Sequence, residues 1–443
     1  MKICLLNDSF PPAIDGVVNV VQNYGTILSE RFGDDVVLAT PHYPDGEYTG
    51  YPYRVIDYPS IDTSALASGY RTGYPVSFKE NAELMDFSPE IIHTHCPFSS
   101  AIMARILREE TDAPLIFTYH TKFDEDIARA VKAKMLQKTA VRAIVNNIEA
   151  CDEVWVVSAG AGENLRSLGF RGKYRVMKNG VDFPKGRVPA EEVREAVKDY
   201  DLPEGVPVFL YVGRLMRYKG LFLILDALKK LHEAGVDFRM VFVGKGPDAE
   251  ELEKTAAQYG IAEKCIFTGP IYDREVLRAI NTRADLFLFP STFDTSGLVV
   301  REAAACGLAA VVIKDACAAE DVVHGRNGYL IEQTPESLYA LLRELVTDLD
   351  AVHAVGERAM EELYVSWTDA VRLARRRYAE IITEKRAGEL PRPERTLGDA
   401  LASMASETIA DINRFFKLSG QMAEEFREDF QGMLDNILGP KGQ

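Results

Sequence analysis

Short, continuously apolar runs alternate with amphipathic helical segments along nearly the whole chain, and this alternation constrains the fold more than any single motif. The first series of apolar runs is KICLLN, DVVLAT, EIIHTH, PLIFTYH and EVWVVS, at 2–7, 35–40, 90–95, 114–120 and 153–158. The second series is PVFLYVG, RMVFVG, KCIFTG, DLFLFP and AAVVIK, at 207–213, 239–244, 264–269, 285–290 and 309–314. Strands that are apolar throughout and joined by helices are typical of parallel sheets covered on both faces. The pattern predicts an α/β protein with two doubly wound, Rossmann-like domains.

A charged stretch with proline and glycine, KGRVPAEEVREAVKDYDLPEGVP at 185–207, separates the two series. We expect the domain boundary there, with a cleft between the domains. In open α/β sheets, ligands bind at the carboxyl ends of the strands. Residues that directly follow a strand are therefore the candidates for a functional site.

Length and composition are those of a globular chain with more than one core. The chain has 443 residues and a net charge of -16, which argues against non-specific binding of nucleic acid, because that needs a basic surface. No apolar run approaches the roughly 18 residues of a membrane span, and MKICLLNDSFPP is unlike a signal peptide. We expect a cytoplasmic protein that could still visit a membrane surface.

The cysteines and histidines give no sign of a metal site. Six cysteines are scattered without a Cys-x-x-Cys pair, which favours small buried thiols in a reducing compartment. His93, His95 and Cys96 are close in sequence, but no further ligands at metal spacing lie nearby. We expect no structural metal.

After PRPER at 391–395, apolar residues recur at steps of three and four as far as Ile437, which predicts one long amphipathic helix or a broken pair. From Arg386 to the end, seven Lys or Arg stand against ten Asp or Glu, a net charge of -3. An acidic helix is a poor anchor on anionic lipid. Two roles remain open for 397–438: association into a homo-oligomer, or docking on the body of the protein.

Several turns after strands carry residues suited to an anion. Gly16 opens the helix expected at about 17–32, where the helix dipole and close approach of the backbone favour an anion. In PVFLYVGRLMRYKG, Arg214 directly follows a strand and Lys219 comes five residues later, so a diphosphate in the cleft could neutralise both. Gly244 shapes the next such turn, FVGKGPDAE. Chain reversal and a solvated basic turn explain the same residues, and spacing alone leaves both explanations open.

The stretch FPSTFDTSGLVVREAAACGLAA, at 289–310, contains a carboxylate in an unusual place. Glu302 belongs to a helix expected at 298–306 that is otherwise apolar, and a buried charge needs a partner. The helix rises roughly 7.5 Å from Gly297 to Glu302, about the distance from the phosphate of a nucleotide to its ribose. Either this is an ordinary capped helix with one awkward acid, or Glu302 and the upstream Asp294 hold a ligand.

The motifs GRLMRYKG, VGKGP, FTGPI and DTSGLVVREAAACG, in this order and after KNGVD at 178–182, resemble those of the retaining glycosyltransferases of family 4, which have the two-domain GT-B fold. The match covers about residues 1 to 385. It implies that Arg214 and Lys219 hold the diphosphate of a nucleotide-sugar donor, and that Glu302 accepts hydrogen bonds from the ribose hydroxyls.

The same resemblance places three consecutive residues, Ser296, Gly297 and Leu298, at the phosphate and sugar of the donor. It places Gly244 in the nucleotide groove, and Gly16 at the diphosphate from the other domain.

The resemblance also divides the chain. It implies an acceptor-binding domain at 1–185, a nucleotide-sugar-binding domain at 186–365, a helix at 366–390 that crosses back to the first domain, and a helical tail at 391–443.

Asp294 departs from the family pattern, which has two glutamates separated by seven residues. Here Asp294 precedes Glu302 with the same gap, and its side chain is one methylene shorter. Either Asp294 contacts the hydroxyls of the donor sugar, or it caps the following helix, as Ser296 also could.

FTYHTKFDED, at 117–126, places His120 at the end of a strand that faces the cleft. The segment resembles the His-Thr turn of family members that glycosylate diacylglycerol or related lipids, in which the matching histidine lies beside the donor sugar and the acceptor. The basic residues within 129–142 form either a solvated surface or a patch that faces a membrane.

The resemblance therefore implies a retaining, metal-independent hexosyltransferase that needs no cofactor. It would move a hexose from a nucleoside diphosphate sugar, such as UDP-glucose, to a hydroxyl of a membrane lipid such as diacylglycerol, or of a saccharide. No residue is well placed as a nucleophile, so we expect attack on the same face of the sugar, assisted by the leaving phosphate. The catalytic set is His120, Asp294 and Glu302. The alternatives are a nucleotide-sugar 2-epimerase of the same fold and an oligomeric scaffold with a vestigial site.

Overall fold

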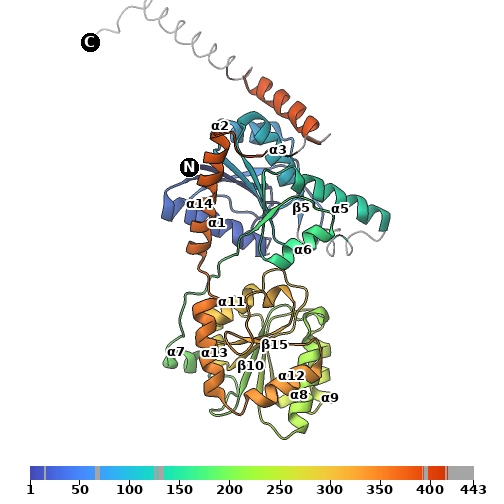
Figure 1. Ribbon diagram of the computed structural model, residues 1–443, viewed down its shortest axis with the longest axis vertical. Helices are drawn as coiled ribbons and strands as arrows, with labels where there is room; N and C mark the ends of the chain where they lie inside the picture. Colours follow the sequence, from blue (N-terminus) through green and yellow to red (C-terminus); the bar gives the residue numbers. More distant parts are fainter. Residues whose placement is uncertain are drawn as a thin grey trace, which may run out of the picture.

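The structure is a computed structural model, and it describes residues 1–13, 16–64, 70–123, 127, 134–391, 393, 398–414 and 417. Two parallel β-sheets, each covered by helices, form the two domains, one above the other in Figure 1. The predicted α/β fold with two doubly wound, Rossmann-like domains is confirmed.

The N-terminal sheet has seven parallel strands in the order β3-β2-β1-β6-β7-β8-β9. Its strands are β1 Lys2–Leu6, β2 Asp35–Pro41, β3 Arg54–Tyr58, β6 Ile91–Thr94, β7 Leu115–Tyr119, β8 Glu153–Val156 and β9 Tyr174–Val176. A small antiparallel pair, β4 (Ser60–Asp62) and β5 (Arg71–Gly73), follows β3. The strand order reverses between β1 and β6, which is where ligands bind in folds of this type.

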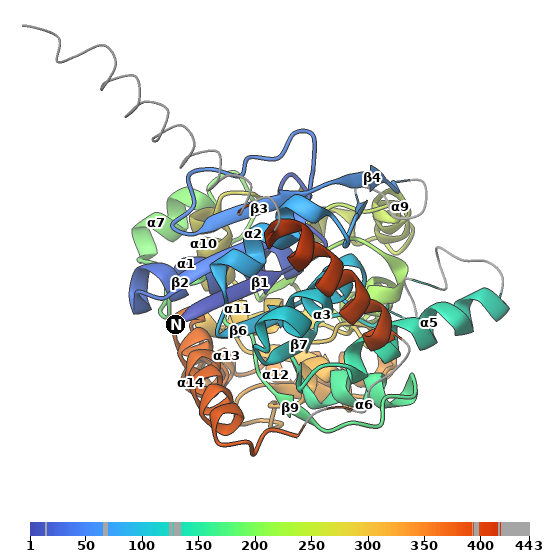
Figure 2. The same ribbon diagram turned by 90° about the horizontal axis from the view of Figure 1, so that it is seen from above.

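Two hydrophobic cores cover the two faces of this sheet. Helices α1 (Gly16–Phe32) and α14 (Trp367–Arg386) pack in one core. The other core contains residues of α2 Phe78–Phe87, α3 Ser99–Thr111, α5 Lys134–Glu149 and α6 Ala159–Ser167. The two groups of helices lie on opposite sides of the sheet in Figure 2.

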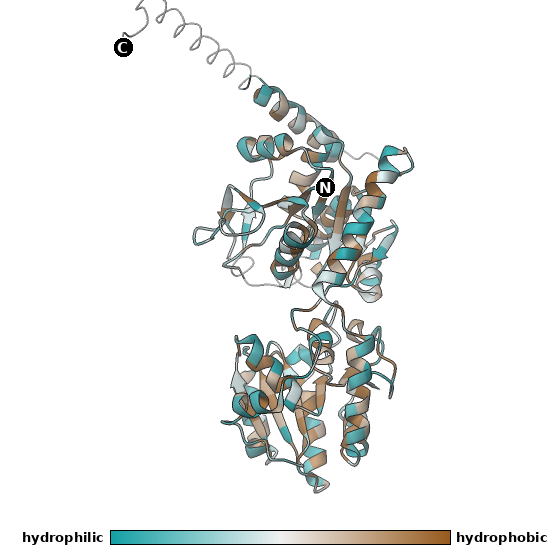
Figure 3. Cartoon of the chain, turned by 90° about the vertical axis from the view of Figure 1, so that its left-hand side faces the viewer, coloured by the Kyte–Doolittle hydropathy of each residue, from teal (hydrophilic) through white to brown (hydrophobic). Residues whose placement is uncertain are grey.

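The C-terminal sheet has six parallel strands in the order β12-β11-β10-β13-β14-β15. Its strands are β10 Val208–Val212, β11 Arg239–Val243, β12 Cys265–Gly269, β13 Leu286–Phe289, β14 Ala310–Ile313 and β15 Tyr329–Ile331. Its helices are α7 Ala190–Ala196, α8 Leu221–Glu233, α9 Ala249–Gln258, α10 Arg274–Arg283, α11 Leu298–Ala305, α12 Pro335–Leu345 and α13 Leu349–Glu362. The strands form the apolar interior and the helices turn polar faces outward, as the hydropathy colours of Figure 3 show.

All ten strands predicted from the apolar runs are present. Three further parallel strands, β3, β9 and β15, occupy edges of the two sheets. β9 and β15 have only three residues each, and the burial of β3 is mixed, so their sequences lack the continuous apolar character on which the prediction relied.

Helix α14 completes the first domain although it follows the second in sequence. Trp367 and Tyr378 are buried in the core that also contains α1. Tyr378 stacks on Trp155, with 5.4 Å between ring centroids, and Arg377 binds Glu153 at 2.6 Å. The packing of these side chains fixes α14 on the N-terminal sheet.

Residues 398–414 form a helix that lies across α2 and α3 (Figure 2). Its buried positions recur at steps of three and four, at Asp399, Ala402, Ser406, Ile409 and Ala410. The predicted amphipathic helix therefore docks on the N-terminal domain over this part of its length, which is one of the two roles left open by the sequence. The remainder of 397–438, apart from residue 417, lies outside the described residues.

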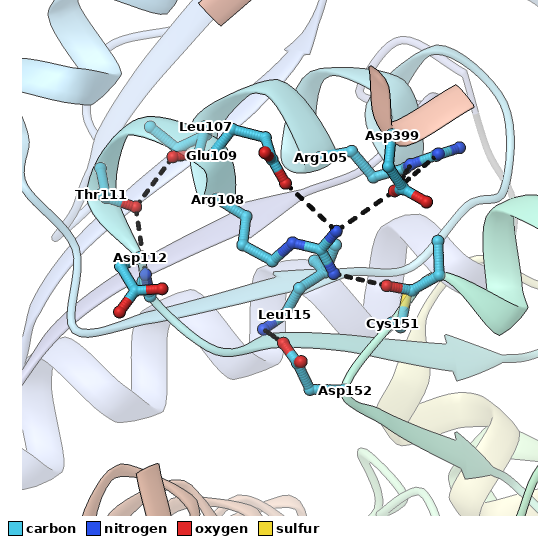
Figure 4. A network of polar contacts seen from close by, with 12 residues as sticks. Arg105, Leu107, Arg108, Glu109, Thr111, Asp112, Leu115, Cys151, Asp152 and Asp399 are labelled. Atoms are coloured by element: carbon cyan, nitrogen blue, oxygen red, sulfur yellow. Dashed lines mark hydrogen bonds and ion pairs between the residues drawn. The ribbon is translucent and has the colours of Figure 1, made fainter. Parts of the chain in front are cut away.

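A buried ion pair secures the docked helix (Figure 4). Nη2 of Arg105 in α3 lies 2.8 Å from Oδ1 of Asp399, and both side chains are at most 6 % exposed. Arg108 reaches the same oxygen at 3.3 Å, and Nη1 of Arg105 donates to Asn147 Oδ1 at 2.8 Å. Gly398 permits this close approach, because a Cβ there would lie 2.6 Å from the Arg105 guanidinium.

The basic stretch at 129–142 is described only from residue 134, within α5. Lys134, Leu136, Lys138 and Arg142 are exposed there. Over the part of the chain that the structure describes, no helix is long and apolar enough to cross a bilayer.

Candidate active site

Lys219 is largely buried and has an anionic partner. Its Nζ lies 2.6 Å from Oδ1 of Asp294. The short 3-10 turn Arg217–Lys219 is drawn toward the end of β13 because Gly220, at φ 76°, carries no side chain: a Cβ there would lie 2.3 Å from the Pro290 carbonyl oxygen. The structure thus joins two predicted site residues in an ion pair that the sequence did not indicate.

Arg214 differs from Lys219 in its surroundings. Its side chain is exposed, and no described carboxylate forms an ion pair with it. The Tyr211 hydroxyl donates to the Arg214 carbonyl oxygen at 3.1 Å and fixes the backbone of the turn. The guanidinium is therefore accessible to an anion from solvent.

Helix α11 begins without a side-chain cap. Its N-cap residue is Gly297, at φ 56°, and no side chain among the described residues accepts a hydrogen bond from the first turn. The explanation of Asp294 or Ser296 as a cap is therefore wrong. The amides that start at Leu298, together with the helix dipole, favour an anion at this end of the helix.

Asp294 has an unused acceptor. Its Oδ1 binds Lys219, whereas Oδ2 is buried and has no hydrogen-bond partner among the described residues. A buried carboxylate oxygen without a donor is costly, so a hydroxyl group placed there would be bound favourably.

Glu302 is buried and paired. Its Oε1 accepts a hydrogen bond from Arg274 Nη2 at 2.7 Å, and only 16 % of the Glu302 side chain is exposed. Burial raises the pKa of Glu302, and the Arg274 guanidinium opposes this shift. The awkward carboxylate of the sequence is therefore satisfied in part by Arg274, a residue that the sequence analysis did not single out.

Arg274 belongs to a chain of polar contacts that reaches the other domain. Its Nη2 lies 3.5 Å from Oδ2 of Asp182, in the segment that joins the domains. Asp182 accepts hydrogen bonds from Asn19 at 3.0 Å and Asn23 at 3.3 Å, both in α1. Asp182 lies in the KNGVD motif, but its partners are distant in sequence, so no local pattern could reveal them.

Two predicted glycines have different surroundings. Gly16 is the first residue of α1, and a Cβ at this position would meet no atom of the described residues within 4 Å. Gly244, at φ 143°, passes so close to Gly213 that a Cβ would lie 1.9 Å from its carbonyl oxygen. Chain packing alone therefore requires glycine at 244, and its contact with a donor stays a prediction.

His120 lies at the interface of the two domains. It follows β7 and is 6 % exposed, and burial lowers its pKa to about 3, so the imidazole is neutral. Its Nε2 is 2.9 Å from Nδ1 of His95. Thr295, next to Asp294, donates from Oγ1 to the His120 carbonyl oxygen at 2.6 Å.

Other contacts tie the loop before α11 to the N-terminal domain. Ser158 donates from Oγ to the Thr295 carbonyl oxygen at 2.5 Å, and Lys122 Nζ lies 3.3 Å from the Thr292 carbonyl oxygen. The structure therefore brings His120 against the loop that carries Asp294, with Lys219 beside that loop and the start of α11 four residues beyond Asp294.

Two family models match the chain and together span both domains. "Glycosyltransferase Family 4" matches residues 14–184, and "Glycosyl transferases group 1" matches residues 192–362. These ranges contain all the predicted site residues.

Among known proteins, the sulfoquinovosyl transferase SQD2 of Arabidopsis thaliana is 28% identical over 376 residues, which cover 82% of this chain and 70% of that protein. The alpha-monoglucosyldiacylglycerol synthase of Streptococcus pneumoniae is 25% identical over 69% of this chain and 70% of its own. The crystal structure of Anabaena HepE in complex with UDP superposes with a TM-score of 0.68 at 18% identity, over 86% of this chain and 100% of that chain. This likeness establishes the GT-B fold. The chain belongs to glycosyltransferase family 4.

Proposed function

We propose that this protein is a retaining glycosyltransferase that moves a hexose from a nucleoside diphosphate sugar to a hydroxyl group of a membrane lipid. UDP-glucose is the favoured donor and diacylglycerol the favoured type of acceptor. The observation that carries the proposal is the grouping of a buried Lys219–Asp294 pair with the uncapped start of α11 at the carboxyl ends of the C-terminal strands. Among the relatives, one is named a monoglucosyldiacylglycerol synthase, and the HepE structure contains UDP.

The donor would lie along the carboxyl edge of the C-terminal sheet. Arg214 and Lys219 would neutralise the diphosphate, and the amides at Gly297 and Leu298 would bind one of its phosphates. Glu302 would accept hydrogen bonds from the ribose hydroxyls through the oxygen that Arg274 does not engage.

The first domain would supply the opposite wall. The 17-residue helix α1 begins at Gly16, and the positive end of its dipole would suit the diphosphate. His120 would donate or accept a hydrogen bond beside the reacting sugar. Ser296 and Gly244 would line the donor groove, as the family resemblance implies.

The chemistry follows from these positions. The bond from the sugar C1 to the diphosphate oxygen breaks, and a bond from C1 to the acceptor oxygen forms on the same face. The acceptor proton passes to the leaving phosphate. Arg214, Lys219 and α11 stabilise the negative charge that grows on this phosphate, which is where preorganised charge contributes most. Because two side-chain cations serve this purpose, we propose that transfer needs no divalent metal and no cofactor.

A lipid acceptor agrees with the outer surface of α5. Lys134, Lys138 and Arg142 are exposed there and, at steps of four residues, lie on one face of the helix. Cations gathered on one face attract anionic lipid. We propose that this surface holds the enzyme against the cytoplasmic face of a membrane.

The proposal is tested by measuring transfer from labelled UDP- and GDP-sugars to vesicles that contain diacylglycerol, with EDTA present and absent. We expect labelled glycolipid from UDP-glucose, with retained anomeric configuration and no effect of EDTA. Transfer to a soluble saccharide alone would overturn the lipid acceptor, and release of free UDP without any acceptor would favour an epimerase. Failure of every nucleotide sugar to raise the melting temperature would overturn the enzyme assignment.

A further inference from the structure

Three histidines form a continuous buried row beneath the proposed reacting centre. His93 lies in β6, His95 directly follows that strand, and His120 follows the neighbouring β7. The ring centroids of His93 and His95 are 4.0 Å apart, and those of His95 and His120 are 5.2 Å apart. Burial lowers the pKa of all three, so each ring is neutral and carries a single N–H.

The inner end of the row is held by hydroxyl groups. Nδ1 of His93 lies 2.6 Å from the Tyr378 hydroxyl, and Nε2 lies 2.7 Å from Thr118 Oγ1. Because a hydroxyl can donate or accept, these contacts satisfy either tautomer of His93. They fix the position of its ring, and they do not determine where its proton lies.

The contact between His95 and His120, the outer pair of the row, restricts the tautomers more strongly, because both partners are histidines. Nδ1 of His95 and Nε2 of His120 are 2.9 Å apart, so one of these two nitrogens must carry the proton and the other must accept it. Nε2 of His95 is buried and has no hydrogen-bond partner among the described residues. If the proton of His95 lay on Nε2, a buried N–H would have no acceptor, and such orphaned donors are rarer than under-satisfied acceptors.

The arrangement with the better hydrogen bonding has the proton of His95 on Nδ1, from which it is donated to His120. Nε2 of His120 is then an acceptor, and the single proton of this ring lies on Nδ1, the nitrogen that forms no hydrogen bond with a described residue. We propose that His95 is a positioning residue, which holds a neutral His120 in the Nδ1–H tautomer and so makes it a hydrogen-bond donor toward the cleft.

This inference rests on the proposed function and narrows the part that His120 plays in it. A neutral imidazole that presents N–H polarises or orients an oxygen of the donor sugar, and it cannot take the acceptor proton through that nitrogen. The main chain of His120 is fixed as well, because its carbonyl oxygen accepts from Thr295 beside Asp294. The ring and the donor loop are therefore held in one geometry.

The first test reads the tautomer directly in the full-length protein. With ¹⁵N-labelled histidine, long-range ¹H–¹⁵N correlation spectra distinguish a protonated ring nitrogen from a bare one, and the His120 signals are assigned by their loss in His120→Asn. We expect a protonated Nδ1 and a bare Nε2 in His120. A protonated Nε2 in His120 would overturn the proposal. This result does not depend on sugar transfer, so failure of the proposed function would be recognised separately.

The second test uses two replacements of His95. His95→Asn keeps an N–H donor close to the position of Nδ1, whereas His95→Leu keeps the volume without a donor. We expect His95→Leu to lower kcat for transfer at least tenfold with an unchanged Kd for UDP, and His95→Asn to restore kcat to within about threefold of the parent. Equal losses of kcat in both variants would overturn the proposal.

Tyr378→Phe is the matched control, because it removes the hydroxyl bound to His93 and leaves the outer pair intact. It should lower the melting temperature and leave kcat unchanged. A loss of kcat in this variant as large as that of His95→Leu would mean that any disturbance of the row has the same effect, and would also overturn the specific role of His95.

Discussion

The Lys219 ammonium lies 2.6 Å from the Asp294 carboxylate, although the two residues are 75 positions apart in the chain. In the proposed donor complex, Lys219 meets a diphosphate while it still has this partner. Asp294 therefore competes with the diphosphate for Lys219, and its second oxygen is left for a hydroxyl of the sugar. Diphosphate affinity and sugar transfer should accordingly respond in opposite directions to changes at Asp294.

Asp294→Asn tests this opposition. Loss of the negative charge should strengthen UDP binding roughly three- to tenfold, about 0.7 to 1.4 kcal/mol, because Lys219 no longer exchanges partners. Loss of the charged acceptor should lower kcat for transfer about tenfold. Titration calorimetry with UDP and steady-state rates with UDP-glucose measure the two effects. Glu251→Gln, which removes an exposed carboxylate bound to Arg217, is the control and should change neither. Weaker UDP binding in Asp294→Asn would contradict the competition.

Glu302→Gln should weaken donor binding through the ribose. A charge-assisted hydrogen bond contributes about 1.5 to 3 kcal/mol, so we expect UDP to bind roughly 10- to 100-fold more weakly. The same substitution should scarcely affect 2′,3′-dideoxy-UDP, which lacks the hydroxyls. An equal loss for both ligands would show that Glu302 acts on the fold around Arg274 and not on the ribose.

The stability of the N-terminal domain should fall on acidification below pH 6.5. The pKa of His93, His95 and His120 is lower in the folded state than in the unfolded chain, so the unfolded chain binds more protons below pH 6.5. Each buried histidine contributes up to about 1.4 kcal/mol per pH unit. Asp8 acts in the opposite direction, because burial raises its pKa from 3.8 to about 6 and the folded state then binds the additional proton.

The contributions of three histidines, less that of Asp8, make the free energy of unfolding fall by roughly 3 kcal/mol per pH unit between pH 6 and pH 5. Urea unfolding measures it, and tryptophan fluorescence reports this domain alone because Trp155 and Trp367 both lie in its core. His120→Asn should flatten the slope by up to about 1.4 kcal/mol per pH unit. A stability that does not fall on acidification over this range would show that these histidines are protonated in the folded protein.

Asp399→Ala should destabilise the N-terminal domain by about 3 kcal/mol, because it leaves the buried Arg105 guanidinium without this carboxylate. Urea unfolding followed by tryptophan fluorescence gives the loss, and limited proteolysis should show cleavage between α14 and the docked helix. Asp411→Asn removes an exposed carboxylate of the same helix that pairs with Arg414, and this control should cost less than about 0.5 kcal/mol. Equal effects of the two substitutions would refute a structural role for the buried pair.

The sequence predicts the central strands well because each of them is buried on both faces and therefore apolar throughout. β10 and β13 are examples, with burial at nearly every position. It misses β9 and β15 because a three-residue edge strand needs no continuous apolar run. The docking of the helix at 398–414 was one of two open alternatives. An apolar stripe on a helix indicates that another surface covers it, but the stripe does not identify that surface.

In the candidate site too, the sequence predicts some residues and misses others. Arg214, Lys219 and Glu302 could be found because strand ends and an anomalous carboxylate are visible in a linear sequence. The partners could not be found: Glu302 binds Arg274 and His120 contacts His95, and each contact depends on how strands and helices are set side by side. Capping of α11 was a reasonable expectation from composition, but Gly297 in a left-handed conformation turns the chain so that Asp294 points to Lys219 instead.

The return of α14 to the first domain has a consequence during synthesis. The core that contains Trp155 lacks α14 until the ribosome has added residues 186–386, about 200 residues beyond the N-terminal sheet. At translation rates of about 5 to 20 residues per second, this interval lasts roughly 10 to 40 s. During that time an apolar face of α1 and β1 is open to water and to other nascent chains, so we expect this half of the protein to depend on chaperones until its last helices emerge.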